Sequence, residues 1–398
     1  MKKLPAIVFI AVVSILILNR CVEPFEVDIP AGANNLLVVD GLITNQAGPY
    51  TVKISRSVSL QENEFQTVNN ATVSIEEEGG PIEILVQTGE GQYQSHENGI
   101  RGAAGKRYRL TIALTDEKRY ESSWVTLKPS PEIDQVYFEF EEKDTEDENE
   151  PLPGVQIFLD THDPDNNTRF YRWEWDETWR YTVPLATSRE YLGNDLIRRL
   201  DTVKGTCWHH ASSNTISIGS SLKSTQDVIS RQPLLFVSNE TDRLRRRYSI
   251  LVKQYAIDQD EYIFWNALQE SNNNPGSFFD KQPQSTTGNL RSLDNSNERV
   301  LGYFSAAGVS TKRIFIDRTD IPRDVKIITG LEACNLKLID KSPTSEQQVF
   351  DALESGMVFF DLKEDFFGNV TGYFLTTRPC ADCTVFGGSL ERPAFWDE

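Results

Sequence analysis

The strongest constraint on the fold is an alternation of apolar and polar residues that recurs between residues 36 and 127. Alternation with a period of two places every second side chain on the same face of a sheet, as in a half-buried strand. Turn-forming residues separate the alternating segments. Strands are predicted over residues 36–39, 50–55, 71–76, 82–87, 91–95, 106–115 and 120–126. Short strands at this density are the pattern of an immunoglobulin-like or transthyretin-like β-sandwich.

Two prolines, Pro129 and Pro131, mark the end of this predicted sandwich, because proline interrupts strand pairing. We therefore expect a β-sandwich domain over residues 36–128 and a larger β-rich domain over residues 129–398. The predicted fold class is mainly β, with a few short helices inserted in the larger domain.

The helices of the larger domain are predicted from their start signals. One helix is predicted to begin at Asp258, because Asp258 and Glu261 have the spacing of a capping box. Another is predicted from Thr344 or Ser345 to Leu353. Further strands are predicted over residues 133–140, 154–160, 169–183, 302–305, 313–317, 357–363 and 372–376.

The acidic balance of the chain excludes nucleic acid as an expected partner. The formal net charge is -19, and residues 1–20 contain three basic residues and no acid, so their removal would leave -22. A protein that binds a polyanion needs a footprint of lysine and arginine. The dense basic stretch from Arg243 to Arg247 is interpreted instead as the solvated face of a strand.

The first residues of the chain predict export and lipid attachment. Lys2 and Lys3 precede an apolar run over residues 4–18, which is too short to cross a bilayer core and fits a cleaved signal peptide over residues 1–20. The run ends in Leu18-Asn19-Arg20-Cys21, which resembles a bacterial lipobox, although an arginine stands where a small residue is usual. We therefore expect a membrane lipid, palmitate for example, on Cys21, followed by an acidic tether over residues 21–35. The alternative is an uncleaved anchor with an unmodified cysteine.

The remaining cysteines predict disulfides, because an even number outside the cytoplasm favours pairing. They are Cys207, Cys334, Cys380 and Cys383, and three pairings are open. Cys380 and Cys383 also have the spacing of a zinc half-site or a redox pair. A zinc site would need two more ligands, which Cys207 and the histidines after it supply only if the fold brings them close. A redox pair would need to begin a helix that follows a strand.

Aromatic residues share one face of the strand predicted over residues 169–183. Two destinations are open for them. An exposed aromatic face could stack on a ligand or a partner, whereas a domain core is favoured because large aromatic side chains dominate core energetics. The residues are Tyr171, Trp173, Trp175 and Trp179.

No sequence motif indicates catalysis, a cofactor or a metal site. The four histidines lie in three separate places, and a nucleophile elbow, a phosphate-binding loop and a zinc helix are absent from the sequence. Asp163, Asp165 and Asn167 alternate as in a calcium loop, but the glycine and the distal glutamate of an EF-hand are missing. We therefore expect no enzyme activity, no cofactor and no metal.

Several unusual strings occur in an order that resembles one known family. They are Tyr171 to Trp179, Gln232 to Phe236, Arg247 to Tyr255, Val300 to Ala306 and Cys380 to Trp396. They resemble the Bacteroidota outer-membrane lipoproteins called domain of unknown function four-two-four-nine, over nearly the whole mature chain. The acidic residues 22–28 are similar to signals that send such lipoproteins to the cell surface. Members are often encoded beside TonB-dependent receptors, and the family carries no assigned catalytic residues.

The resemblance implies an accessory role in the cell envelope. The first expectation is an outer-membrane lipoprotein, on the cell surface or on the periplasmic face, that helps a TonB-dependent transporter to capture its cargo. The alternative is an envelope scaffold or assembly factor that binds other outer-membrane proteins. A hydrolase is a remote third hypothesis. An open pocket lined by aromatic residues would favour cargo capture over a scaffold.

Overall fold

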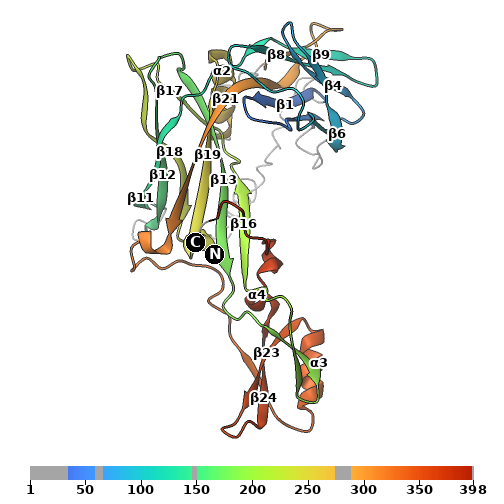
Figure 1. The fold of residues 1–398 in the computed structure, drawn as a ribbon, viewed down its shortest axis with the longest axis vertical. Helices are drawn as coiled ribbons and strands as arrows, with labels where there is room; N and C mark the ends of the chain where they lie inside the picture. Colours follow the sequence, from blue (N-terminus) through green and yellow to red (C-terminus); the bar gives the residue numbers. More distant parts are fainter. Residues whose placement is uncertain (1–34, 59–65, 146–149, 274–287, 397–398) are drawn as a thin grey trace, which may run out of the picture.

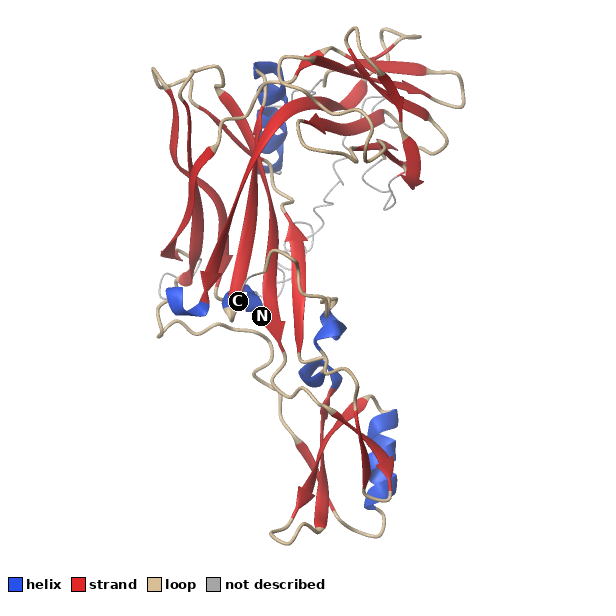
Figure 2. Cartoon of the chain, in the orientation of Figure 1, coloured by secondary structure: helices blue, strands red, loops and turns tan. Residues whose placement is uncertain are grey.

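The computed structural model describes residues 35–58, 66–145, 150–273 and 288–396. Strands dominate this part of the chain, and its helices are few and short, so the predicted fold class is confirmed (Figure 2). The expected signal peptide, Cys21 and nearly all of the tether lie outside the described residues. Among the residues described, no helix is long and apolar enough to cross a bilayer.

A β-sandwich forms the N-terminal end of the described chain (Figure 1). Its first sheet contains β1 (Leu37–Thr44), β2 (Thr51–Arg56), β3 (Gln66–Thr67), β6 (Val86–Gly89), β7 (Gln92–Gln94) and the first part of β21 (Val300–Asp317). Its second sheet contains β4 (Thr72–Glu77), β5 (Ile82–Ile84), β8 (Arg107–Ala113), β9 (Arg119–Ser122), β10 (Val125–Thr126) and β20 (Leu290–Ser292). The alternating apolar residues of both sheets meet in one core, as the period of two predicts.

A second, central sandwich follows. One sheet contains β13 (Phe170–Thr182), β16 (Thr206–Ser212), β17 (Ser217–Ser220), β19 (Arg247–Ala256) and the second part of β21, and the facing sheet contains β11 (Ile133–Lys143), β12 (Leu152–Asp163) and β18 (Asp227–Ser238). The helix α2 (Gln259–Asn273) packs on β13 and β17. Short 3-10 turns, η1 (Asp242–Leu244) and η2 (Arg318–Asp320), follow β18 and β21.

A third, smaller unit lies at the end opposite the N-terminal sandwich (Figure 1). It contains the hairpin of β14 (Arg189–Gly193) and β15 (Leu196–Arg199), the sheet of β22 (Lys337–Asp340), β23 (Met357–Glu364) and β24 (Val370–Thr377), and the helix α3 (Ser345–Glu354). Its core is separate from the cores of the sandwiches. The chain then forms α4 (Arg378–Ala381) and η3 (Cys383–Phe386).

The strand β21 belongs to both sandwiches. Its first residues pair in parallel with β1, from Val300 to Ala307, and its last residues pair antiparallel with β19, from Gly308 to Asp317. Separate strands over residues 302–305 and 313–317 were predicted, and this prediction is wrong. The residues between them remain in the strand because they pair with β1 up to Ala307 and with β19 from Gly308 onward.

Strands beyond residue 129 therefore complete the N-terminal sandwich. Both β20 and the first part of β21 belong to it, so the two sandwiches do not separate cleanly at residue 128. The small C-terminal unit is a third body within the range expected to form one larger domain.

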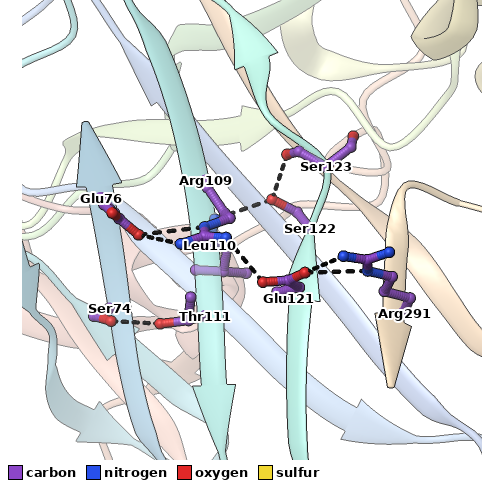
Figure 3. A network of polar contacts seen from close by, with 9 residues as sticks. All are labelled: Ser74, Glu76, Arg109, Leu110, Thr111, Glu121, Ser122, Ser123 and Arg291. Atoms are coloured by element: carbon purple, nitrogen blue, oxygen red, sulfur yellow. Dashed lines mark hydrogen bonds and ion pairs between the residues drawn. The ribbon is translucent and has the colours of Figure 1, made fainter. Parts of the chain in front are cut away.

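An ionic network joins the strands on the outer face of the second sheet (Figure 3). Arg109 on β8 contacts Glu76 on β4 at 2.6 Å and Glu121 on β9 at 2.9 Å. Glu121 also accepts a hydrogen bond of 3.1 Å from Arg291 on β20, and the Arg109 guanidinium lies 4.6 Å from the centre of the Trp124 ring. The network thus ties β20, which is distant in sequence, to the sheet that precedes it.

Replacing Glu121 by glutamine should loosen this edge. Arg109 and Arg291 would lose a shared carboxylate whose side chain is only 12% exposed, so we expect a loss of about 1 to 2 kcal/mol. Urea unfolding and amide exchange of residues 290–292 measure the effect. The control is Glu78→Gln, which breaks an exposed pair with Arg107 and should cost at most about 0.5 kcal/mol. Equal effects of the two variants would contradict the prediction.

Two disulfides hold the C-terminal segment. Cys207 on β16 pairs with Cys383 in η3, and Cys334 pairs with Cys380 in α4. The closely spaced Cys380 and Cys383 are therefore each bonded to a distant cysteine and not to one another. The bonds attach the chain after β24 to β16 of the central sandwich and to the segment just before β22.

Removing the bond between Cys207 and Cys383 should release the C-terminal segment. That bond spans 176 residues and the other spans 46, so loop closure predicts a larger loss for Cys207→Ala with Cys383→Ala than for the other pair. We expect about 2 to 4 kcal/mol for either pair. Thermal unfolding and limited proteolysis after residue 383 report the change, and wild-type behaviour of both variants would refute it.

Candidate functional site

A cleft of about 340 Å³ lies where the two sandwiches and α2 meet. The N-terminal sandwich contributes Asp40 and Leu42 from β1 and Lys53 from β2. The central sandwich contributes residues of β13 and the residues 214–217 before and at the start of β17, and α2 contributes Trp265. Side chains from three distant parts of the sequence therefore line one cavity, which only the folded arrangement can create.

Arg172 on β13 is the charged centre of the cleft. Its side chain is largely buried, and its Nη1 contacts Glu174 at 2.8 Å. The guanidinium carbon lies 4.9 Å from the centre of the Tyr255 ring and 4.8 Å from that of the Trp265 ring. Its buried Nε has no hydrogen-bond partner and lies 4.0 Å from Glu261. Two aromatic rings and two carboxylates therefore surround the Arg172 guanidinium.

Glu261 on α2 lies behind Arg172 and is only 1% exposed. Its Oε1 accepts hydrogen bonds from Trp265 Nε1 at 3.1 Å and from Ser305 Oγ on β21 at 2.6 Å. Burial raises the pKa of this carboxyl above its ordinary value, and Arg172 and these hydrogen bonds act in the opposite direction. The residue therefore links α2, β13 and β21 at the back of the cleft.

The start of α2 explains why Glu261 points inward. The Glu261 backbone N–H donates to Asp258 Oδ1 at 2.8 Å, which is one half of the predicted capping box. The Glu261 side chain does not return to the cap but turns toward Trp265 and Ser305. Ring contacts of Tyr262 with Phe170 and of Phe264 with Tyr303 seat the helix on both sandwiches.

Glu174 lies on the same face of β13 as Arg172, and it has a further hydrogen-bond partner besides that arginine. Tyr255 on β19 donates its hydroxyl to Glu174 Oε2 at 3.0 Å. Burial and the nearby carboxylate raise the pKa of Tyr255, so it acts as a neutral donor. The cleft consequently offers charges of both signs beside an indole ring, and such a surface can bind a ligand that combines polar groups with an apolar face.

The aromatic residues predicted from the sequence do not form an exposed face. They point between the sheets of the central sandwich, because a sheet that packs on another buries its largest apolar side chains. Their burial matches the favoured core position, and a role in ligand or partner binding stays a prediction. Exposures are 0% for Tyr171, 0% for Trp173, 3% for Trp175 and 9% for Trp179.

Trp173 also contributes to the cleft wall. Its Nε1 donates to Gln254 at 3.0 Å, which satisfies the buried indole. Arg172 and Trp265 were not predicted as site residues. The available signal was the charged series Arg172, Glu174 and Asp176, which occupies the opposite face of the aromatic strand.

The residues that alternate as in a calcium loop serve a turn. The carboxylate of Asp163 accepts hydrogen bonds from the backbone N–H groups of Asp165, Asn167 and Thr168 at 2.8 to 3.0 Å. In the described ranges of the chain, no three histidine, cysteine, aspartate or glutamate side chains gather as metal ligands would.

The predicted basic strand face is also corrected by the structure. Residues 242–244 form η1, and β19 begins only at Arg247. Arg243 contacts the buried Glu177 at 3.0 Å and lies over the Trp179 ring, so this cluster stabilises the edge of the central sandwich.

A family model described as "Domain of unknown function (DUF4249)" matches residues 22–313. The chain belongs to this family. The DUF4249 match confirms the family expected from the residues. It includes every residue of the cleft, both sandwiches up to Arg313 and the β14–β15 hairpin, and it ends before β22, α3, β23 and β24 of the C-terminal unit. No curated protein matches the chain.

Glu261→Gln should change how stability depends on pH. Because the pKa of Glu261 is raised in the folded protein, the folded chain retains a proton that the unfolded chain releases near the ordinary value of 4.5. The stability of the wild type should therefore fall, relative to the variant, as pH rises from that value through the folded-state pKa. Glutamine keeps an acceptor for Trp265 and Ser305 but cannot ionise.

Urea unfolding at intervals from about pH 4 to about pH 8 measures this difference. Asp260→Asn, at an exposed neighbour on α2, is the control and should show no comparable trend. A stability difference between wild type and Glu261→Gln that stays constant with pH would contradict the assignment.

Proposed function

We propose that this protein is an exported lipoprotein, attached to the outer membrane through Cys21, that assists a TonB-dependent transporter by holding cargo in the cleft. It binds and does not catalyse. The cleft between the sandwiches is the observation that carries this proposal.

Ligand sites favour domain junctions and combine apolar walls with a few placed polar groups. The cleft has this composition, with Trp265 and Trp173 beside Arg172, and its volume lies at the lower end of the range for small-molecule sites. Its residue Glu174 is engaged by Arg172 and Tyr255, which suits recognition better than acid–base chemistry. The chemistry of the walls favours a cargo that pairs an apolar or aromatic face with charged groups.

Location outside the cytoplasm is supported by two independent features. The sequence up to Cys21 has the order of a lipoprotein signal, and both disulfides are of the kind that persists in an oxidising compartment. A TonB-dependent receptor is the suggested partner, because members of the family that the sequence resembles are often encoded beside such receptors.

An envelope scaffold is the second candidate. The elongated arrangement favours it, because the N-terminal sandwich and the C-terminal unit lie at opposite ends of the molecule (Figure 1). Surfaces so far apart can contact different partners at the same time.

Affinity purification from membranes tests the proposal. The wild-type chain should recover a barrel receptor, and its mature N-terminus should be an acylated Cys21 by mass spectrometry. Cys21→Ser should abolish the lipid, release the chain from the membrane and lower receptor recovery about tenfold or more, because tethering raises the effective concentration of the partners. Val22→Ala is the control. A bare thiol on Cys21, or no receptor with the wild type, would refute the proposal.

A further inference from the structure

The hairpin of β23 and β24 ends in two phenylalanines that face solvent. Phe366 is 97% exposed and Phe367 is 85% exposed. The hairpin of β23 and β24 lies at the end of the molecule opposite the N-terminal sandwich (Figure 1). Large aromatic side chains bury about 150 to 250 Å² each when they find a partner. Two adjacent ones without cover form an apolar tip, here defined as residues 364–369.

The tip is held in shape by its own hydrogen bonds. Asp365 Oδ1 accepts from the backbone N–H groups of Phe367 at 2.8 Å and Asn369 at 2.9 Å, and Asn369 Nδ2 donates to Asp365 Oδ2 at 2.9 Å. Gly368 has a φ of 81°, which favours glycine. The two rings meet edge to face with centres 5.6 Å apart. A rigid turn that presents aromatic side chains loses little conformational freedom on binding.

The charges around the tip select its partner. Glu364 is exposed, and the hydrogen bonds of the turn lower the pKa of Asp365, which keeps that carboxylate anionic at neutral pH. The nearby lysines are already paired, Lys363 with Asp340 and Lys341 with Asp195. An anionic lipid surface would repel this tip, and so would a second copy of a chain whose net charge is -19. An apolar pocket with a basic rim complements it.

We propose that the tip docks, through Phe366 and Phe367, into an apolar pocket rimmed by lysine or arginine on a partner protein. This contact is separate from the cleft and does not depend on what the cleft binds. The paired phenylalanines enter the pocket, and Glu364 and Asp365 meet its basic rim.

Photo-crosslinking of the full chain in intact cells tests the proposal. The photoreactive amino acid p-benzoylphenylalanine replaces Phe366, and in a matched control it replaces Leu222, which is 60% exposed on the central sandwich. We expect one discrete protein adduct from position 366 and none from position 222. Adding Glu364→Lys should reduce the adduct at least fivefold, because the reversed charge faces a basic rim. Adding Phe367→Ala should also reduce it.

The attached peptide, identified by mass spectrometry, should contain apolar residues flanked by lysine or arginine. Four results would overturn the proposal: no adduct, an adduct with lipid, an adduct between two copies of this chain, or an adduct that is insensitive to Glu364→Lys. Intact disulfides and an unchanged thermal unfolding curve confirm that each variant is folded. Since the readout does not involve the cleft or a receptor, its failure would leave the membrane purification to be judged separately.

Discussion

Backbone hydrogen bonds along β21 hold the two sandwiches in one arrangement. The strand changes partners between Ala307 and Gly308, where its neighbour β1 ends and its pairing with β19 begins. At this point the Gly308 N–H donates to Lys128 O at 2.8 Å and the Val309 N–H donates to Asn45 Oδ1 at 2.8 Å. The buried backbone donors of Gly308 and Val309 are therefore both satisfied, and buried donors are costly to leave unpaired. The glycine is required because a Cβ atom there would lie 2.4 Å from Lys128 O.

The cleft is a consequence of this crossing. The first part of β21 brings the β1 and β2 edge of one sandwich beside β13 of the other, and Ser305 on β21 hydrogen-bonds the glutamate that lies behind Arg172. Moving the sandwiches relative to one another would break the buried hydrogen bond between Ser305 and Glu261 and would change the charged surroundings of Arg172. A wall built on paired strands is thus more rigid than one built on loops, and a preformed wall suits recognition.

Local patterns predicted the elements well and their partners poorly. Alternation located the strands of the N-terminal sandwich, and the Asp258 cap located α2, because both signals act over a few residues. The parallel pairing of Leu37 with Val300 has no local signal, since its residues are far apart in sequence. The same limit applies to the cysteines, whose spacing left three pairings open and whose partners are set by the tertiary structure. The cleft could not be predicted because its walls meet only after these long-range contacts form.

The extent of the family match distinguishes the two proposed binding surfaces. The cleft lies wholly within residues 22–313, whereas the phenylalanine tip lies outside that range, in a unit with its own core that is followed by a disulfide to the central sandwich. Residues that line the cleft are constrained by the crossing of β21, so a change there disturbs both sandwiches. The tip is constrained only by its turn. The residues at the tip can therefore change without altering the cleft.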